Sequence, residues 1–165
     1  EEIAPNMDEN MDKMDLDNID QKIIRCLQQN ARMSMTELAG RVGLSKTPVT
    51  QRVHNLEQRG VISAYRAVLS PIQLGLTHIT YVEVRLSDTK ETALQRFNDA
   101  IKAIPEVEEC YMIAGNFDYL VKVRSRDIAH YREVMGEKIS ALPYVASTSS
   151  FVAMEAVVEQ AIVEI

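Results

Sequence analysis

The sequence predicts an α+β protein with an N-terminal winged helix-turn-helix followed by a ferredoxin-like βαββαβ domain. Two short helical patterns around a glycine fill residues 34–62. From residue 77 onward, strand-like and helix-like apolar patterns follow in the order β-α-β-β-α-β. Basic residues concentrate in the first part of a chain whose formal net charge is −6. These three observations define the two parts.

The helix-turn-helix is marked at its start, its turn and its end. Ser34 and Glu37 form a capping box, and Gly43 supplies the sharp turn. Ser45 is a second N-cap, and Gly60 ends the second helix. The inward face consists of apolar residues at helical spacing: Leu38, Ala39, Val42, Val49, Val53 and Leu56. Paired short helices of this form are typical of proteins that read the DNA major groove.

The outer face of the second helix carries polar side chains suited to base edges. At about 100° per residue, this face lies opposite the apolar stripe. The candidate DNA-binding residues are Lys46, Thr47, Thr50, Gln51, Arg52, His54 and Arg59. A solvated surface helix with scattered charges is the alternative. Against it, residues 45–66 hold four Lys or Arg residues and one acid, Glu57.

Net charge changes sign along the chain. Residues 1–14 carry a net charge of −4, residues 15–66 carry +3, and residues 67–165 carry −5. An acidic protein therefore contains a basic segment at one end. This asymmetry favours double-stranded DNA as the partner of residues 15–66.

Several functional classes find no support in the sequence. No apolar run approaches the ~18 residues that span a membrane, and no secretory signal, metal-ligand spacing or phosphate-binding glycine loop is present. Cys26 and Cys110 are expected to be free thiols in a reducing cytosol. No cofactor is expected. We interpret residues 1–14 as a disordered leader. Candidate native starts are Met7, Met11 and Met14.

The predicted domains are a DNA-binding domain at 15–66, a linker at 67–76, a second domain at 77–159 and a tail at 160–165. A turn-rich joint from Ser70 to Gly75 marks the boundary. The first helix is expected from Asp15 or Asp17 to Asn30, and a wing hairpin or outgoing strand at 61–69. The second domain is expected to contain strands at 79–86, 107–113, 119–123 and 148–157, and helices at 89–103 and 127–142.

Strands of the second domain carry apolar residues on both faces, as at Tyr81 and Val82 or at Phe151 and Val152. Helices would cover one face, so the other face requires a partner. A second copy of the chain is the simplest partner and gives a two-fold dimer. A dimer would place two reading helices at half-sites about 34 Å apart or a multiple of this distance. A monomer with a fully covered sheet is the alternative.

Two stretches carry a family resemblance: LDNIDQKIIRCLQQNARMSMTELAGRVGLSKTPVTQRVHNLEQRGVI, and ECYMIAGNFDYLVKV followed by SSFVAMEAV. With these motifs, residues 15–157 resemble the Lrp/AsnC, or feast/famine, family of bacterial and archaeal transcriptional regulators. The resemblance implies sequence-specific control of amino-acid metabolism, a free amino acid as effector, and homodimers that assemble into octamers. It also implies a cytoplasmic, nucleoid-associated protein.

The same resemblance supplies candidate effector residues, which relatives place in a cleft between neighbouring dimers. They are Gly115, Asn116, Phe117, Asp118, Tyr119, Thr148 and Ser150. Relatives commonly have an acid where this chain has Asn116, which leaves ligand preference open. Gly115 permits positive φ and a close backbone approach. The Asp118 carboxylate suits an α-ammonium group, and a turn-forming role is its alternative.

Two other functional classes compete with an effector-responsive regulator. An enzyme is disfavoured because three scattered histidines (His54, His78 and His130) offer no nucleophile–base pair, so no catalytic residue is assigned. The second is a nucleoid-like architectural protein that binds DNA without a ligand. Leucine, another branched-chain amino acid, proline and methionine all stay open as effectors, as do the operator and the sign of regulation.

Overall fold

The computed structural model describes residues 16–159. The predicted leader, the candidate start methionines and the tail at 160–165 lie outside this range. The described chain forms two compact units, residues 16–68 and 69–159. Each unit has its own cluster of buried apolar side chains, and the division falls within the predicted linker at 67–76.

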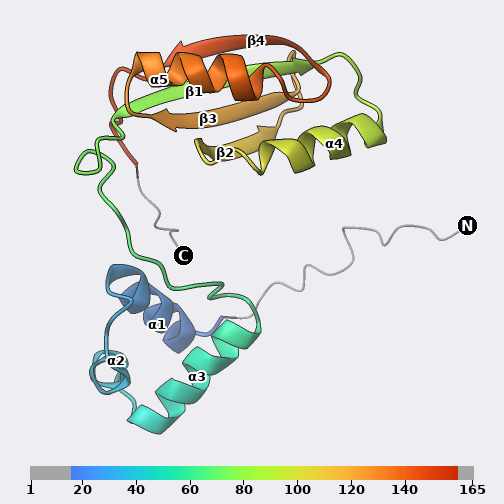
Figure 1. Ribbon diagram of the computed structural model, residues 1–165. Helices are drawn as coiled ribbons and strands as arrows, with labels where there is room; N and C mark the ends of the chain where they lie inside the picture. The colour runs from blue at the N-terminus through green and yellow to red at the C-terminus, as the bar shows by residue number, and fades with distance from the viewer. Residues whose placement is uncertain (1–15, 160–165) are drawn as a thin grey trace, which may run out of the picture. The chain divides into compact units, whose positions relative to one another are not determined.

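The first unit contains the three predicted helices: α1 (Asn18–Gln29), α2 (Met35–Val42) and α3 (Lys46–Gln58) (Figure 1). The Asp17 carboxylate caps α1 by accepting hydrogen bonds from Ile19 and Asp20, and Ser34 caps α2 by accepting one from Glu37. The core of the unit is apolar and largely as predicted: Ile23, Leu27, Met33, Leu38, Ala39, Val42, Val49, Val53 and Leu56.

Glycines end α2 and α3 as predicted. Gly43 has φ 75° and Gly60 has φ 73°, both left-handed conformations that suit glycine. The prediction for Ser45 is only half right. Ser45 occupies the N-cap position of α3, but its side chain makes no capping hydrogen bond. Pro48 stands at the third helical position and has no backbone N–H, so a usual capping donor is missing.

The predicted wing at 61–69 is wrong as a strand or hairpin, because residues 61–77 contain no strand in the structure. Alternating apolar residues do not form a strand unless their backbone groups also find partners, and no described segment pairs with this one. The segment instead makes a local side-chain contact, in which the Tyr65 hydroxyl donates to Glu57 at 2.7 Å. The predicted turn is present, with Leu74 N–H donating to Ser70 and Gly75 at φ 70°.

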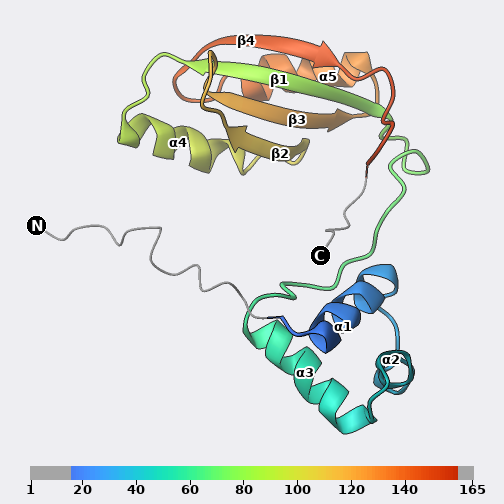
Figure 2. The ribbon, with the colours of Figure 1, turned by 180° about the vertical axis from the view of Figure 1, so that it is seen from behind.

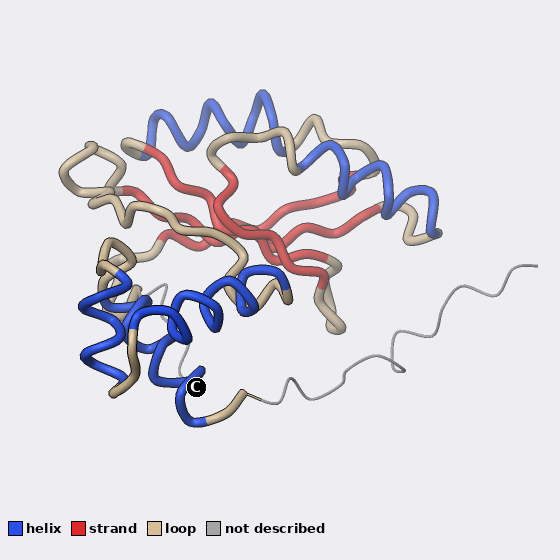
Figure 3. The backbone as a smooth tube through the Cα atoms, turned by 90° about the horizontal axis from the view of Figure 1, so that it is seen from below, coloured by secondary structure: helices blue, strands red, loops and turns tan. Residues whose placement is uncertain are grey.

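The second unit has the predicted βαββαβ order in a four-stranded antiparallel sheet of strand order β2-β3-β1-β4 (Figures 1 and 2). Its elements are β1 (His78–Leu86), α4 (Glu91–Ile101), β2 (Val107–Met112), β3 (Tyr119–Ser125), α5 (Ile128–Val134), the π-helix η1 (Met135–Ile139) and β4 (Val145–Val152). Figure 3 shows the helices of this unit together on one side of the sheet. The predicted α+β architecture is confirmed.

Two of the predicted elements have clearly different bounds in the structure. The last strand runs over Val145–Val152 and not over 148–157, because β1 begins at His78 and the last backbone bond to it is donated by Ala153 N–H to the carbonyl of Ile79. The last helix begins as predicted, with the Asp127 carboxylate accepting from His130 N–H. It then widens into η1, a change of period that an apolar pattern does not reveal.

The register assigns side chains to the two faces of the sheet. Val82 and Val84 of β1 are fully buried beneath the helices, with Ser150 and Thr148 of β4 directly opposite them. We call the other side the open face. On it, the cross-strand partners Tyr81 and Phe151 are 39% and 53% exposed.

The sequence pattern predicts an apolar open face, but the structure also places charged residues on it. Lys122 and Arg124 of β3 are each 8% exposed. They form ion pairs with three surrounding carboxylates, those of Glu108, Glu109 and Glu159. The apolar pair at Tyr81 and Phe151 therefore adjoins a cluster of ion-paired side chains on β3.

Candidate DNA-binding helix and effector turn

The α3 helix presents the polar face that the sequence predicts. Val49, Val53 and Leu56 are buried against α1 and α2, which turns the opposite side of the helix outward. The exposed candidates are Lys46, Thr47, Thr50, Gln51, His54 and Arg59. The side chain of Arg52 is only 33% exposed. The helix thus offers hydrogen-bonding side chains on one accessible surface, as a base-reading helix must.

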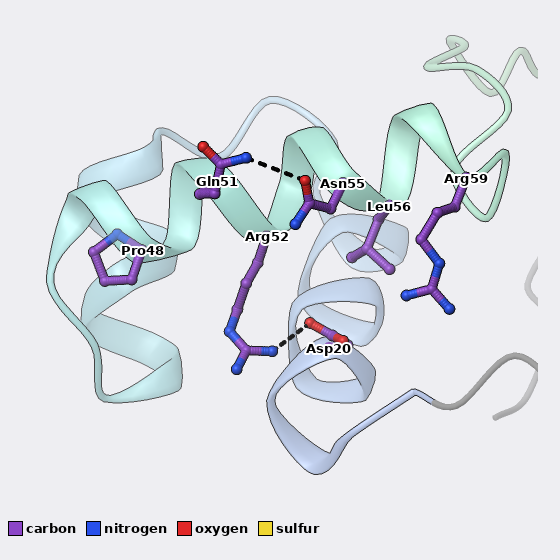
Figure 4. Close-up of a pocket in the computed structure, with 7 residues that line it drawn as sticks. All are labelled: Asp20, Pro48, Gln51, Arg52, Asn55, Leu56 and Arg59. Atoms are coloured by element: carbon purple, nitrogen blue, oxygen red, sulfur yellow. Dashed lines mark hydrogen bonds and ion pairs between the residues drawn. The ribbon is translucent and has the colours of Figure 1, made fainter.

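The structure shows Arg52, a predicted DNA contact, in an ion pair that the sequence did not predict. One nitrogen of its guanidinium lies 2.7 Å from an oxygen of Asp17 and 2.7 Å from an oxygen of Asp20 (Figure 4). Asp20 is 8% exposed, so its carboxylate needs this partner. Backbone hydrogen bonding from Asp20 and the ion pair with Arg52 hold the pKa of Asp17 below its ordinary value. Arg52 therefore joins α3 to the start of α1.

A side-chain pair on α3 was missed by the sequence interpretation. Gln51 donates a hydrogen bond from Nε2 to Oδ1 of Asn55 at 3.1 Å, and both side chains are exposed. The four-residue spacing between them is the sequence signal that could have revealed it. Both residues line a surface hollow of about 410 Å³, which Figure 4 shows between α3 and the beginning of α1.

Two basic residues near the ends of α3 are available for phosphates. Lys46 and Arg59 are exposed, and neither has an ion-pair partner within residues 16–159. His54 lies 3.9 Å from a Glu57 oxygen, and the Thr50 hydroxyl donates to the carbonyl of Lys46. The helix thus has amide side chains in its middle, which can read base edges, and cations at its ends, which can bind phosphates. DNA-binding proteins commonly divide their contacts in this way.

The candidate effector turn joins β2 to β3, and Asp118 holds it to the neighbouring strand. Its Oδ2 accepts a hydrogen bond from Leu86 N–H at 2.7 Å, and its own N–H donates to Val84 at 2.9 Å. This carboxylate contact is structural, but it reaches another strand and not the turn's own backbone, as the turn-forming alternative for Asp118 had assumed. Gly115 does not use the positive φ that the sequence interpretation allowed it, and a Cβ there would lie 3.4 Å from Ile113.

Three other effector candidates lie near one another on the helix-covered side of the sheet. Tyr119 and Thr148 both pair with Val84, one from each neighbouring strand. The Tyr119 hydroxyl donates to Asn98 at 2.7 Å, and the hydroxyls of Tyr131 and Ser150 lie 2.5 Å apart. The remaining candidates are on the turn, with Asn116 exposed and Phe117 half-buried. The structure therefore places the two candidate segments at adjoining positions of the sheet.

We also searched the described part of the chain for membrane-spanning helices, metal sites and reactive thiols. No helix between residues 16 and 159 is long and apolar enough to cross a membrane. In the same range, no group of three or more His, Cys, Asp or Glu side chains could hold a metal ion. Cys26 and Cys110 are free thiols, and burial raises the pKa of Cys110 to about 11, which disfavours the reactive thiolate.

Comparison with protein families gives two matches that together span most of the chain. A winged helix-turn-helix DNA-binding model matches residues 16–63, and the Lrp/AsnC ligand binding domain model matches residues 79–163. The first match contains α1, α2 and α3, and the second contains the four strands of the sheet except for His78, the first residue of β1.

Relatives and solved structures agree with this assignment. The proline dehydrogenase transcriptional activator of Rhodobacter capsulatus is 66% identical over 145 residues, which cover 88% of this chain and 94% of the relative. An AsnC family regulator from Agrobacterium tumefaciens has a TM-score of 0.86 at 32% identity, covering 90% of this chain and 96% of that one.

A Neisseria meningitidis regulator solved with L-methionine has a TM-score of 0.83 at 28% identity, with coverage of 88% and 94%. The resemblance found in the sequence is thus confirmed at the levels of family and fold, including the ligand-binding domain. This chain belongs to the Lrp/AsnC family and is an effector-responsive, DNA-binding transcriptional regulator, not an enzyme.

Proposed function

We propose that this regulator senses proline and activates transcription of a proline dehydrogenase gene. The observation that supports the proposal is the 66% identity to the Rhodobacter capsulatus activator over 94% of that protein's length. Among the effectors that the sequence left open, proline is the one whose breakdown such a gene would control.

The proposed effector site is the turn from Gly115 to Tyr119 together with Thr148 and Ser150. The L-methionine bound by the Neisseria relative supports an amino acid as ligand for this fold. Asp118 uses Oδ2 for Leu86, and its other carboxylate oxygen has no hydrogen bond within residues 16–159. That oxygen is suited to an α-ammonium group, the cationic feature that proline shares with other amino acids.

The proposed assembly is a homodimer through the open face, with dimers combining into octamers. Exposed aromatic side chains on that face, those of Tyr81 and Phe151, support a buried contact between two copies. Two DNA-binding units on one dimer then bind two half-sites, and the linkage strengthens binding beyond that of a single unit. An amino acid alters DNA affinity through its different affinity for two assemblies or orientations.

A thermal-shift screen of the full-length protein against the twenty amino acids tests the effector. Proline at 100 times its Kd should stabilise the native state by about 2.7 kcal/mol, a rise of several degrees in Tm. A rise with leucine or methionine but not with proline would overturn the proposed effector and leave amino-acid sensing intact.

Titration of a proline dehydrogenase promoter duplex tests the target. The expected result is tighter binding to this duplex than to random DNA, with proline changing the affinity or the assembly. Equal affinity for both duplexes at all salt concentrations would instead indicate an architectural protein.

A further inference from the structure

The Gln51–Asn55 contact has a chemical consequence for DNA recognition. A glutamine amide offers two N–H donors and one carbonyl acceptor. Here one donor is already used, because Gln51 Nε2 bonds to Asn55 Oδ1 at 3.1 Å. One N–H and the carbonyl of Gln51 stay available, since neither has another partner within the described part of the chain.

The remaining pair of groups on Gln51 complements one base edge. Adenine presents its N7 acceptor and its N6 amino donor side by side in the major groove. A single amide satisfies both when its carbonyl faces N6 and its N–H faces N7. An amide rotated by half a turn presents the groups in the wrong order, so its orientation determines whether the base is read.

Asn55 is placed to set this orientation. Its Oδ1 is an acceptor, so it favours the rotamer of Gln51 that points nitrogen toward it. Asn55 lies one helical turn after Gln51, and Figure 4 shows the two side chains joined on the same side of α3. Arg59 lies one further turn along α3 and also lines this hollow, so its cation is available for a phosphate beside the base.

We infer that Asn55 is a positioning residue for base recognition, which fixes the Gln51 amide in the orientation that reads an adenine in the operator. Gln51 makes the contact, and Asn55 acts through it. The inference rests on DNA binding by α3 and is independent of the effector and of the target gene.

The test uses the full-length protein and a duplex selected by that protein from a random-sequence library. Each adenine of the duplex is replaced in turn by 7-deazaadenine, which lacks only the N7 acceptor. For each protein the Kd ratio of modified to unmodified duplex is measured, so the fraction of active protein cancels. At one adenine, the ratio for the unmodified protein should be on the order of tenfold.

Three variants complete the experiment. Gln51→Ala and Asn55→Ala should each bring the ratio at that adenine close to one, and the double variant should add nothing. Asn55→Asp keeps the acceptor and should retain the ratio while binding every duplex less tightly, because its charge faces phosphates. Gln58→Ala removes another exposed amide of α3 and serves as the matched control, with the ratio unchanged.

Two results would overturn the inference. In the first, Asn55→Ala weakens binding to all duplexes equally and leaves the ratio at the Gln51-dependent adenine unchanged, which would make the side-chain bond a helix stabiliser. In the second, no adenine shows a ratio that depends on Gln51.

Discussion

Oδ2 of Asp118 lies 2.7 Å from the backbone nitrogen of Leu86, so a carboxylate of the effector turn replaces a backbone acceptor at the end of β1. Asp118→Ala would leave the part-buried N–H of Leu86 without its partner. We expect the free energy of unfolding of the sheet unit to fall by about 1–3 kcal/mol, measured by urea denaturation.

The Asp118→Asn variant tests separately the structural role of Asp118 and its role in the amino-acid response. The amide oxygen can still accept from Leu86, so stability should stay within about 0.5 kcal/mol of the unmodified protein. The negative charge is lost, so the amino-acid response in an operator titration should be strongly weakened while ligand-free DNA binding persists. An undiminished response in this variant would show that Asp118 serves the turn alone.

Arg52 and Arg59 should behave differently although both are arginines on α3. Arg52→Ala removes the partner of Asp20, which is 8% exposed, and should lower the stability of the helical unit by about 1–3 kcal/mol. Thermal unfolding followed by circular dichroism measures this change.

Arg59→Ala should leave thermal unfolding unchanged, because Arg59 is exposed and has no ion pair within residues 16–159. It should weaken binding to every duplex and reduce the salt slope of log Kd by about one. If Arg52→Ala produced this pattern with unaltered stability, Arg52 would act as the phosphate contact that the sequence predicts and not as a structural link.

Acid should weaken the Asp17 contacts selectively. The pKa of Asp17 in the folded protein lies below its ordinary value of 3.8, because of backbone hydrogen bonding from Asp20 and the ion pair with Arg52. A depressed pKa contributes stability above pH 3.8 that disappears as pH falls through the folded value. The stability difference between the unmodified protein and Asp17→Asn should therefore be constant near neutrality and vanish in strong acid. A difference that persisted unchanged across this range would contradict the assignment.

The open face should control assembly. Phe151→Glu places a charge on an exposed aromatic position of that face and should lower the oligomeric mass measured by light scattering. Ile128→Glu is the matched control, since Ile128 is an equally exposed apolar residue on α5 at 53%. Its mass should not change. Loss of assembly in the control alone would place the dimer contact on the helical side.

Local signals explain which features of the fold were predictable. Caps at Asp17 and Ser34 and turns at Gly43 and Gly60 depend on residues close in sequence, and their chemistry restricts the backbone directly. The order of strands and helices followed from apolar periodicity for the same reason.

Features that depend on distant partners were less predictable. Residues 61–69 alternate like a strand but find no pairing segment among the described residues. The partners of Arg52 lie 32 and 35 positions away, and the Leu86 contact of Asp118 lies 32 positions away. Such side chains are chosen by tertiary contacts that a single sequence does not display. Asn55 differs from these residues, because its partner Gln51 is only four positions away but Asn55 lies beside the polar face of α3 and not on it.

The two buried clusters described above share no residue. A substitution in one core therefore demands no compensating change in the other. After gene duplication, mutations on α3 can direct a copy to new operators while its ligand specificity is inherited unchanged. Conversely, mutations in the sheet unit can change the ligand that a copy binds while the copy keeps its original operators. This separation allows a family to diversify its regulons and its signals at independent rates.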